Sequence, residues 1–345
     1  VDECYAQQGG KRMIPESLFR TSPVITRYPE PVLTSKDVPY DSNLTFNAGV
    51  VKENGRYIML FRNDYGCTRE QFEKEGRNFA GTNIGLAFSD DGIHWQVESQ
   101  PVLELRDEEI SRAYDPRITC MDGQYYVCFA VDTRHGVRGG IFSTHDFHHF
   151  APISLSVPDN RNMVLFPEKI GGKYVRLERP MPVYSTGGHF FDIWLSDSPD
   201  LAYWGNSRLV LSCRDVPFCN DKIGPGAPPL KTDAGWLVIF HSVDVDPARG
   251  KNGWEDAWRK RYVIGVMLLD LEDPSRVIGL CKVPLMAPEG PEEQIEGFRT
   301  NALFPCGMIL EDDQTVRIYY SASDTVVRLA TAKLDDLISL CTEKP

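Results

Sequence analysis

The sequence predicts an all-β fold, a five-bladed β-propeller that forms one domain over residues 1–345. Two observations favour this fold. Long amphipathic helices are almost absent, and one pattern recurs five times: an apolar strand, a glycine-containing turn, a second strand, and a turn rich in Ser, Asp and Gly. A small sheet cannot bury both its faces alone, whereas a ring of such sheets buries them and removes most free edges. The repeats therefore favour a propeller over a β-sandwich, the alternative all-β arrangement.

The five predicted blades follow one another along the chain with irregular spacing. They cover residues 46–92, 114–146, 164–198, 223–270 and 301–332. Residues 1–22 are predicted to be an N-terminal extension, and residues 334–345 a short C-terminal helix and tail. Uneven repeats fit an enzyme built on a propeller better than a regular interaction repeat.

Two segments interrupt the repeats, each directly after an inner hairpin, which places both near one mouth of the central channel. Residues 66–81 are charged and helix-like, and we expect a solvated surface loop. Residues 244–261 carry Trp254 and Trp258. These indoles could stack on a sugar ring or could belong to a second surface loop, and the sequence leaves both interpretations open.

Composition excludes several function classes. The net charge of −12 argues against nucleic acid and anionic membranes as partners, because both bind basic surfaces. No stretch approaches eighteen consecutive apolar residues. Nine cysteines without a Cys-x-x-Cys pair support neither a zinc nor a redox motif, so we expect no metal and no cofactor. We expect a cytoplasmic protein, or a periplasmic one if a leader was removed upstream of Val1, and the oligomeric state stays open.

Every predicted blade carries polar residues near the start of its first strand or the end of its second. Charged side chains beside apolar strands are costly unless they are paired or solvated. Their presence at equivalent places in all blades predicts one shared polar cavity at the centre. The set consists of Asn47, Arg62, Asp64, Asp115, Arg117, Arg161, Arg179, Lys222, His241, Asn301 and Asp324.

Four members of this set come from two adjacent blades and can carry positive charge: Arg161, Arg179, Lys222 and His241. Two guanidinium groups and an ammonium group suit a tetrahedral oxyanion such as phosphate. Each arginine taken alone could instead pair with a nearby carboxylate, Glu168 or Glu178. The clustering of all four in an acidic chain favours the anion site.

Asp115 stands in the motif Tyr-Asp-Pro-Arg, residues 114–117. Proline fixes its own backbone angle and restricts the residue before it, so the carboxylate is held in a defined direction. A general acid needs such positioning. A turn cap or an ion pair with Arg117 would explain the motif equally well, and spacing alone does not decide between these interpretations.

Eight short motifs, taken together and in this order, resemble glycoside hydrolase family 130, the β-mannoside phosphorylases and related mannosidases. The resemblance extends from about residue 23 to about residue 336. The motifs are Phe-Asn-Ala-Gly (46–49), Leu-Phe-Arg (60–62), Tyr-Asp-Pro-Arg (114–117), Asn-Arg-Asn with Leu-Phe-Pro (160–167), Glu-Arg-Pro (178–180), Lys-Ile-Gly-Pro-Gly (222–226), Phe-His (240–241) and Ser-Asp-Thr (323–325).

The resemblance implies a five-bladed propeller with its active site in the central cavity. It maps the family's single acid onto Asp115 and its phosphate-binding residues onto Arg161, Arg179, Lys222 and His241. Its mannosyl-site residues map onto Asn47, Arg62, Asp64 and Asp324. Arg117, in the same motif as Asp115, is predicted to bind substrate as well.

The implied reaction is an inverting phosphorolysis, in which phosphate attacks the anomeric carbon and α-mannose 1-phosphate leaves. Asp115 supplies the proton, in the family by relay through a mannose hydroxyl. Phosphate needs a cationic site and no base, whereas an inverting hydrolase needs a second carboxylate to activate water.

Two other functions stay open on the same fold. One is an inverting β-mannosidase with Glu168, Asp64 or Asp324 as the base. The other is a non-catalytic propeller that binds a glycan or a protein. The four basic residues favour the phosphorylase, whose partners would be a β-mannoside and inorganic phosphate, while the acceptor sugar and the linkage stay undefined.

Overall fold

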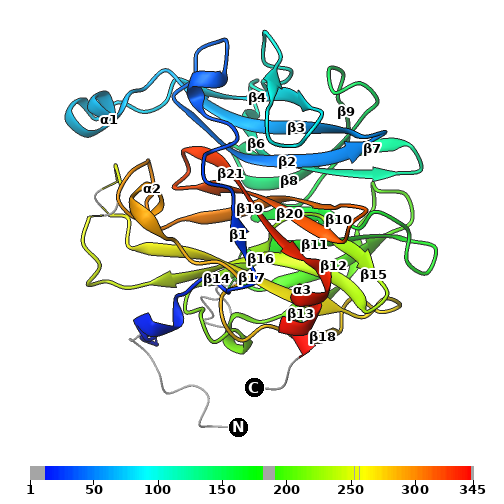
Figure 1. Ribbon diagram of the computed structural model, residues 1–345. Helices are drawn as coiled ribbons and strands as arrows, with labels where there is room; N and C mark the ends of the chain where they lie inside the picture. The colour runs from blue at the N-terminus through cyan, green and yellow to red at the C-terminus, as the bar shows by residue number, and fades with distance from the viewer. Residues whose placement is uncertain (1–11, 182–190, 252, 256, 343–345) are drawn as a thin grey trace.

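Five antiparallel sheets form a ring of blades (Figure 1). The computed structural model describes residues 12–181, 191–251, 253–255 and 257–342. The innermost strands are β2 (Leu44–Glu53), β6 (Ile110–Met121), β10 (Asn160–Leu165), β14 (Lys222–Pro225) and β19 (Leu303–Leu310). They contact one another in the order β19, β2, β6, β10, β14, and blade four contacts β19 through β16 and β17. The predicted five-bladed propeller is therefore confirmed.

Three further strands continue each blade outwards. The second strands are β3 (Arg56–Tyr65), β7 (Gln124–Thr133), β11 (Tyr174–Pro180), β16 (Gly235–Val245) and β20 (Thr315–Ala322). The third are β4 (Gly81–Ser89), β8 (Gly136–Thr144), β12 (Ile193–Ser198), β17 (Lys260–Leu269) and β21 (Val326–Lys333). The outermost are β5 (Gln96–Val97), β9 (Ala151–Leu155), β13 (Gly205–Leu211), β18 (Val277–Leu280) and β1 (Thr26–Arg27). A short strand, β15 (Leu230–Thr232), also pairs with β16.

The outermost strand of the last blade comes from the beginning of the chain. β1 pairs with β21, Thr26 opposite Thr331, so blade five contains strands from both ends of the sequence (Figure 1). The Arg27 guanidinium fixes this strand by donating to the buried carboxylate of Glu293 and to the carbonyl of Ala287. This closure of the ring was not anticipated, because a two-residue strand has no periodicity that a sequence pattern could reveal.

Three inner strands share the same local irregularity. The pairing register shifts between Phe46 and Gly49 in β2, between Tyr114 and Arg117 in β6, and between Arg161 and Val164 in β10. At these bulges the chain adopts the left-handed conformation, with φ of 48° at Asn47, 56° at Asp115 and 57° at Asn162. Bulges redirect side chains, and left-handed non-glycine residues are strained, so this backbone is typical of functional sites.

A repeated turn links the third and fourth strands of blades one to three. In each, a Ser or Thr hydroxyl accepts from the amide three residues later, and an Asp two residues after the hydroxyl accepts from two further amides. The hydroxyl and carboxylate pairs are Ser89 and Asp91, Thr144 and Asp146, and Ser198 and Asp200. These are the turns rich in Ser, Asp and Gly that the sequence showed, and their capped backbone keeps the outer edges regular.

Apolar layers between neighbouring blades form the core. Leu60 and Leu86 of blade one, for example, pack with Val127 and Phe129 of blade two. Strand alternation directs one face of each sheet to each neighbour. Polar residues occupy the ends of the inner strands, outside these apolar layers.

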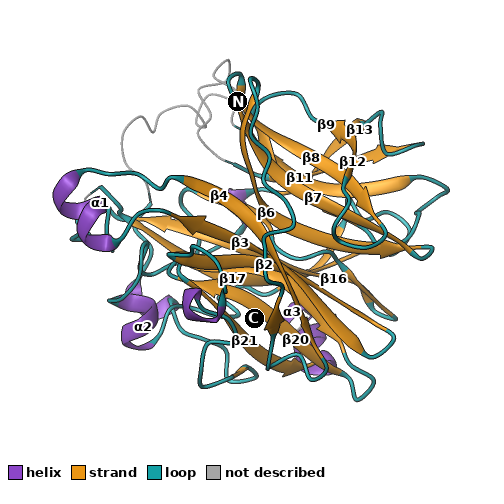
Figure 2. Cartoon of the chain, turned by 90° about the horizontal axis from the view of Figure 1, so that it is seen from above, coloured by secondary structure: helices purple, strands orange, loops and turns teal. Residues whose placement is uncertain are grey.

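In the described part of the chain helices are few and lie at the periphery. They are α1 (Arg69–Glu75), α2 (Gly290–Gln294), α3 (Leu334–Thr342) and the 3-10 turns η2 (Glu16–Leu18), η3 (Ser35–Asp37) and η5 (Cys213–Asp215). α3 lies where a C-terminal helix was expected and packs against β18 and β17. α1 and α2 lie on the same side of the molecule (Figure 2). No helix within the described ranges is long and apolar enough to cross a membrane.

Candidate active site

Asp115 is held by two blades at the bulge of β6. Its Oδ1 accepts a hydrogen bond of 2.8 Å from Nδ2 of Asn47 and a longer one of 3.4 Å from Nη1 of Arg62. The Ser321 hydroxyl donates to Oδ1 of Asn47 at 2.6 Å and so fixes its amide. No hydrogen bond from the described residues reaches Oδ2 of Asp115.

Close packing of two backbones supports this arrangement. A Cβ at Gly49 would lie 2.6 Å from the carbonyl oxygen of Pro116, so only glycine lets β2 approach β6 this closely. The motif Phe-Asn-Ala-Gly at residues 46–49 thus supplies both the amide that holds Asp115 and the glycine that lets the strands meet.

Arg62 and Asp64 form a fixed pair next to Asp115. Nε and Nη2 of Arg62 donate to the two oxygens of Asp64 at 2.9 and 2.7 Å, and the Thr82 hydroxyl donates to Oδ1 of Asp64 at 2.6 Å. The guanidinium lies over the rings of Phe46 and Tyr114 at 4.5 and 4.8 Å. Burial opposes its charge, but Asp64 and Asp115 outweigh burial and raise the pKa of Arg62. Arg62 is therefore a permanent cation.

Arg117 lies behind Asp115 rather than beside its carboxylate. Its side chain is 1% exposed, and it donates to the carbonyl oxygens of Gly226 at 2.5 Å and of Asp115 at 3.0 Å. These contacts fix the backbone of two inner strands. The ion pair with Asp115, one of the interpretations that the sequence left open, is not formed, because Arg117 donates to the carbonyl of Asp115 instead. Substrate binding by Arg117 stays a prediction.

Arg161 and Arg179 lie opposite each other in β10 and β11. Nη1 of Arg161 donates to the Tyr114 hydroxyl at 3.3 Å, which connects the basic residues to Asp115. Arg179 is 1% exposed, and its Nη1 lies 3.5 Å from Nε2 of His241. Nε of Arg161 and both Nε and Nη2 of Arg179 are buried without an acceptor among the described residues. Burial and the charge of Arg161 lower the pKa of Arg179 to about 9.

Lys222 and His241 complete the basic cluster from blade four. Lys222 shares the ring of Phe191 with Arg179, at 5.6 and 5.1 Å. Burial and Arg179 lower the pKa of Lys222 to about 8, so the ammonium form predominates at neutral pH. Burial and Arg179 also hold the pKa of His241 well below its usual value. His241 was expected to be able to carry charge, but it is a neutral imidazole here.

His241 occupies its position because of a second glycine. A Cβ at Gly224 would lie 2.4 Å from Cε1 of His241 and 3.0 Å from Nδ2 of Asn162. The imidazole packs between Phe304 and Tyr262, with ring centroids 4.6 and 5.9 Å away. Gly224, the first glycine of the motif Lys-Ile-Gly-Pro-Gly, therefore leaves the space that the imidazole occupies in the cluster.

Glu168 and Glu178 do not neutralise these arginines. Glu178 accepts from Asn160 and pairs with Arg176 at 2.8 Å. Glu168 is exposed and pairs with Lys231 at 2.6 Å. Glu168 lies three residues beyond the end of β10, whereas Arg161 is the second residue of that strand. Neither carboxylate therefore pairs with Arg161 or Arg179, and Glu168, one of the three candidate bases for hydrolysis, is engaged with Lys231 instead.

Asp324 also has a left-handed backbone, with φ of 48°. Nη1 of Arg299 contacts its Oδ2 at 3.4 Å, while Nε and Nη2 of Arg299 donate to Glu255 at 2.9 and 2.7 Å. Burial raises the pKa of Asp324, and the nearby charges of Arg299 and Arg62 act against this rise. Sequence reasoning missed Arg299 and Glu255, because neither residue lies in a recurring blade position.

The two inserted segments pack against each other instead of forming separate loops. Phe72 and Phe79 of the first segment pack on Trp254 of the second, at 6.0 and 6.2 Å, and all three contact Phe298. Segment 66–81 is therefore not the simple solvated loop that was expected. Trp258 is 8% exposed, stacks on Tyr262 at 5.6 Å and donates to the carbonyl of Thr300. Both indoles are thus engaged in internal packing.

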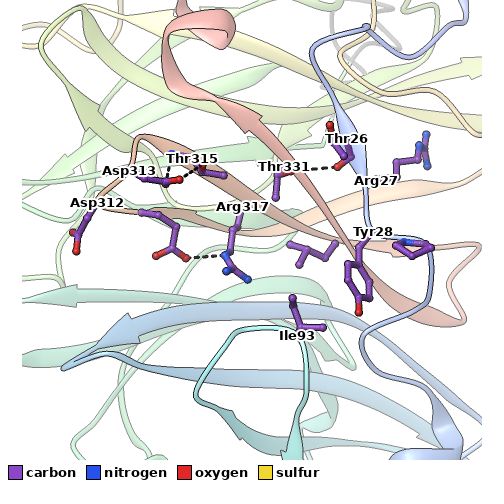
Figure 3. A pocket seen from close by; sticks show the side chains of 12 residues that line it. Thr26, Arg27, Tyr28, Ile93, Asp312, Asp313, Thr315, Arg317 and Thr331 are labelled. Atoms are coloured by element: carbon purple, nitrogen blue, oxygen red, sulfur yellow. Dashed lines mark hydrogen bonds and ion pairs between the residues drawn. The ribbon is translucent and has the colours of Figure 1, made fainter.

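A separate cavity of about 560 Å³ lies between blade five and the turn of blade one that carries Ile93 (Figure 3). Tyr28, Arg317 and Asp313 are among its lining residues, and it shares no residue with the predicted site. Arg317 is paired there with Glu311 at 2.7 Å. Arg317 in this cavity thus has a carboxylate partner, whereas Arg161 and Arg179 of the inner strands have none among the described residues.

The inner strands thus bring hydrogen-bonding groups and a strained aspartate close to two arginines, Arg161 and Arg179, that have no carboxylate partner within the described ranges. Fold and site together define an enzyme-type propeller suited to a polyhydroxy ligand and an oxyanion. The chain belongs to glycoside hydrolase family 130: the family model, described as β-1,4-mannooligosaccharide phosphorylase, matches residues 19–343.

Individual relatives cover most of the chain. A β-1,4-mannooligosaccharide phosphorylase from Ruminococcus albus is 33% identical over 91% of this chain and 90% of its own length. A 1,2-β-oligomannan phosphorylase from Thermoanaerobacter sp. is 32% identical over 89% of this chain and 96% of its own. The structure of β-1,2-mannobiose phosphorylase from Listeria innocua, in complex with β-1,2-mannobiose, superposes with a TM-score of 0.78. It covers 92% of this chain and 99% of that one at 27% identity.

Proposed function

We propose that this chain catalyses the phosphorolysis of a β-mannoside by inorganic phosphate and releases α-mannose 1-phosphate with inversion at the anomeric carbon. The observation that carries the proposal is the buried basic cluster. Arg161, Arg179 and Lys222 bring three positive charges together, and no carboxylate within the described ranges pairs with either arginine. Buried charges without partners are costly, so such a cluster is expected where an anionic ligand completes it.

Asp115 is the proposed acid. An oxygen of phosphate attacks the anomeric carbon while the glycosidic bond breaks, and the leaving oxygen takes up a proton that originates from Asp115. Asn47 and Arg62 hold Oδ1 of Asp115, and the strained backbone directs the carboxyl group, so the proton donor is positioned before substrate binds. Asn47, Arg62, Asp64 and Asp324 are proposed to bind the mannosyl unit.

Hydrolysis finds less support in the same geometry. An inverting hydrolase requires a second carboxylate with room for a water molecule. Both oxygens of Asp64 are engaged with Arg62 and Thr82, and Glu168 is exposed and paired with Lys231. Asp324 is the remaining acid of the three, and Arg299 already contacts it. A nucleophile that is itself an anion fits this site better than a water that needs a base.

A product balance tests the proposal. The protein is incubated with β-1,2-mannobiose, β-1,4-mannobiose and β-1,4-mannosylglucose, each with and without inorganic phosphate, and mannose 1-phosphate is measured against free mannose. Mannose 1-phosphate that appears only with phosphate supports the proposal and identifies the acceptor. Free mannose at a rate independent of phosphate would make the chain a mannosidase and return the search for a base to Asp324.

A further inference from the structure

One guanidinium joins the second inserted segment to the proposed mannosyl site. Arg299 makes two short hydrogen bonds to Glu255 of segment 244–261 and one longer contact of 3.4 Å to Asp324. Burial opposes the charge on Arg299, but Glu255 and Asp324 outweigh burial and raise its pKa. Arg299 therefore binds more closely to Glu255, which lies outside the blades, than to Asp324 of the proposed mannosyl site.

The position of Glu255 is fixed by its neighbours in sequence. The amide of Trp254 donates to the carbonyl of Phe298 at 2.8 Å, and the two rings meet edge to face at 5.4 Å. Gly253, with φ of 82°, allows this approach, because a Cβ there would lie 2.2 Å from the Phe298 carbonyl oxygen. The pairing of residues 254 and 298 places Glu255 directly opposite Arg299.

We infer that Glu255 is a positioning residue, which restrains Arg299 so that Asp324 keeps its carboxylate directed at the mannosyl unit. This inference rests on the proposed function, in which Asp324 contacts the sugar. It also gives segment 244–261 a role: the segment brings a carboxylate to the site from outside the propeller.

The physical reason lies in the geometry of the guanidinium. Arginine presents its donors in a rigid planar fork, so two bonds to Glu255 fix the direction of the third nitrogen. Without the charge of Glu255, the fork is free to rotate and pair bidentately with Asp324. Both oxygens of Asp324 would then be engaged by protein and lost to sugar hydroxyls.

Four variants separate positioning from general stability. Glu255→Gln removes the charge at nearly constant shape, and Glu255→Asp keeps the charge. Arg299→Lys keeps a cation but loses the fork. Glu73→Gln is the matched control, because Glu73 pairs with Lys251 at 3.0 Å between the same two segments and has no contact with the site. Calorimetric titration with β-1,2-mannobiose and β-1,4-mannobiose, without phosphate, measures binding independently of turnover.

Glu255→Gln and Arg299→Lys are expected to weaken binding of the preferred mannobiose about tenfold, the effect of one charge-assisted hydrogen bond. Glu255→Asp should stay within about threefold of the wild type, and Glu73→Gln should equal it. Phosphate affinity should be unchanged in all four, because the basic cluster comes from blades three and four.

Wild-type mannobiose affinity in Glu255→Gln would overturn the inference. If Glu255→Gln is unfolded, the Arg299→Lys variant provides the test. Wild-type mannobiose affinity in Arg299→Lys overturns the inference, and a loss of affinity for mannobiose but not for phosphate supports it. A wild-type protein that binds mannobiose but forms no mannose 1-phosphate would refute the proposed reaction, while the comparison among variants still tests Glu255. A wild-type protein that binds neither mannobiose would overturn both.

Discussion

Arg179→Met separates the two effects of a buried cation, its cost to folding and its use in binding. Arg179 is 1% exposed, and two of its nitrogens have no acceptor among the described residues. A pKa lowered from the ordinary arginine value to about 9 means that the folded environment disfavours the charged form. In principle the shift corresponds to roughly 5 kcal/mol, and relaxation and water penetration reduce the realised cost to about 1–3 kcal/mol. Methionine fills a similar volume without a charge.

The sign of the stability effect follows from linkage. For a base with a lowered folded-state pKa, the unfolded chain takes up the proton first as pH falls from the ordinary arginine pKa, so the destabilisation builds up over that range and is complete below about 9. Removing the charge should therefore stabilise the phosphate-free protein at pH 7 by about 1–3 kcal/mol. For a chain of this length the melting temperature would rise by about 2–4 °C.

Phosphate should bind the wild-type protein much more tightly than the Arg179→Met variant. Two charge-assisted hydrogen bonds from Arg179 to an oxyanion correspond to about 3–5 kcal/mol, so the KM for phosphate should rise at least about a hundredfold in the variant. Mannobiose affinity should stay within about twofold. Lys333→Met, which removes an exposed lysine paired with Asp313, serves as the control.

Differential scanning fluorimetry with and without phosphate, together with initial rates against phosphate concentration, measures both effects. The reasoning predicts a more stable phosphate-free variant that phosphate no longer stabilises. A variant that melts several degrees lower without phosphate, or that keeps its phosphate KM within twofold, would refute it.

Three further predictions follow from the site. Asp115→Asn should lower kcat about 10²–10⁴-fold with an unchanged melting temperature, and near-normal turnover would remove Asp115 as the acid. Gly49→Ala, whose Cβ would lie 2.6 Å from the Pro116 carbonyl oxygen, should cost about 1–3 kcal/mol in urea unfolding and lower kcat; a stable, fully active variant would show that β2 and β6 can separate freely. Lys222, with a pKa lowered to about 8, loses its proton as pH rises through 8, so the KM for phosphate should rise above that pH. Lys222→Arg should shift this rise to higher pH. A variant whose pH profile of KM is identical to that of the wild type would exclude Lys222 from the phosphate site.

Features that repeat or stay local could be predicted from the sequence. The five blades follow from strand and turn patterns that depend on neighbouring residues only. Asn47, Arg62, Asp64 and Asp115 fall at blade positions where a polar residue interrupts an apolar strand, and the structure brings these four into direct contact.

Features that depend on contacts between distant residues could not be predicted. β1 is too short for any pattern and acquires its strand character from β21. Glu255 and Arg299 meet because Trp254 pairs with Phe298, a contact without a sequence motif. The neutral state of His241 depends on burial and on neighbouring cations, neither of which its residue type reveals. Glu168 directly follows the motif at residues 160–167, but it is exposed and pairs with Lys231, a contact that no motif reveals.

The most direct test of the central claim, that phosphate itself attacks the anomeric carbon, uses phosphate labelled with ¹⁸O. The reaction is run with the preferred β-mannoside, and the product is followed by ¹³C and ³¹P nuclear magnetic resonance. The account predicts α-mannose 1-phosphate with ¹⁸O in the bridge between C1 and phosphorus. Free mannose that carries oxygen from water, or a β-configured phosphate ester, would contradict it.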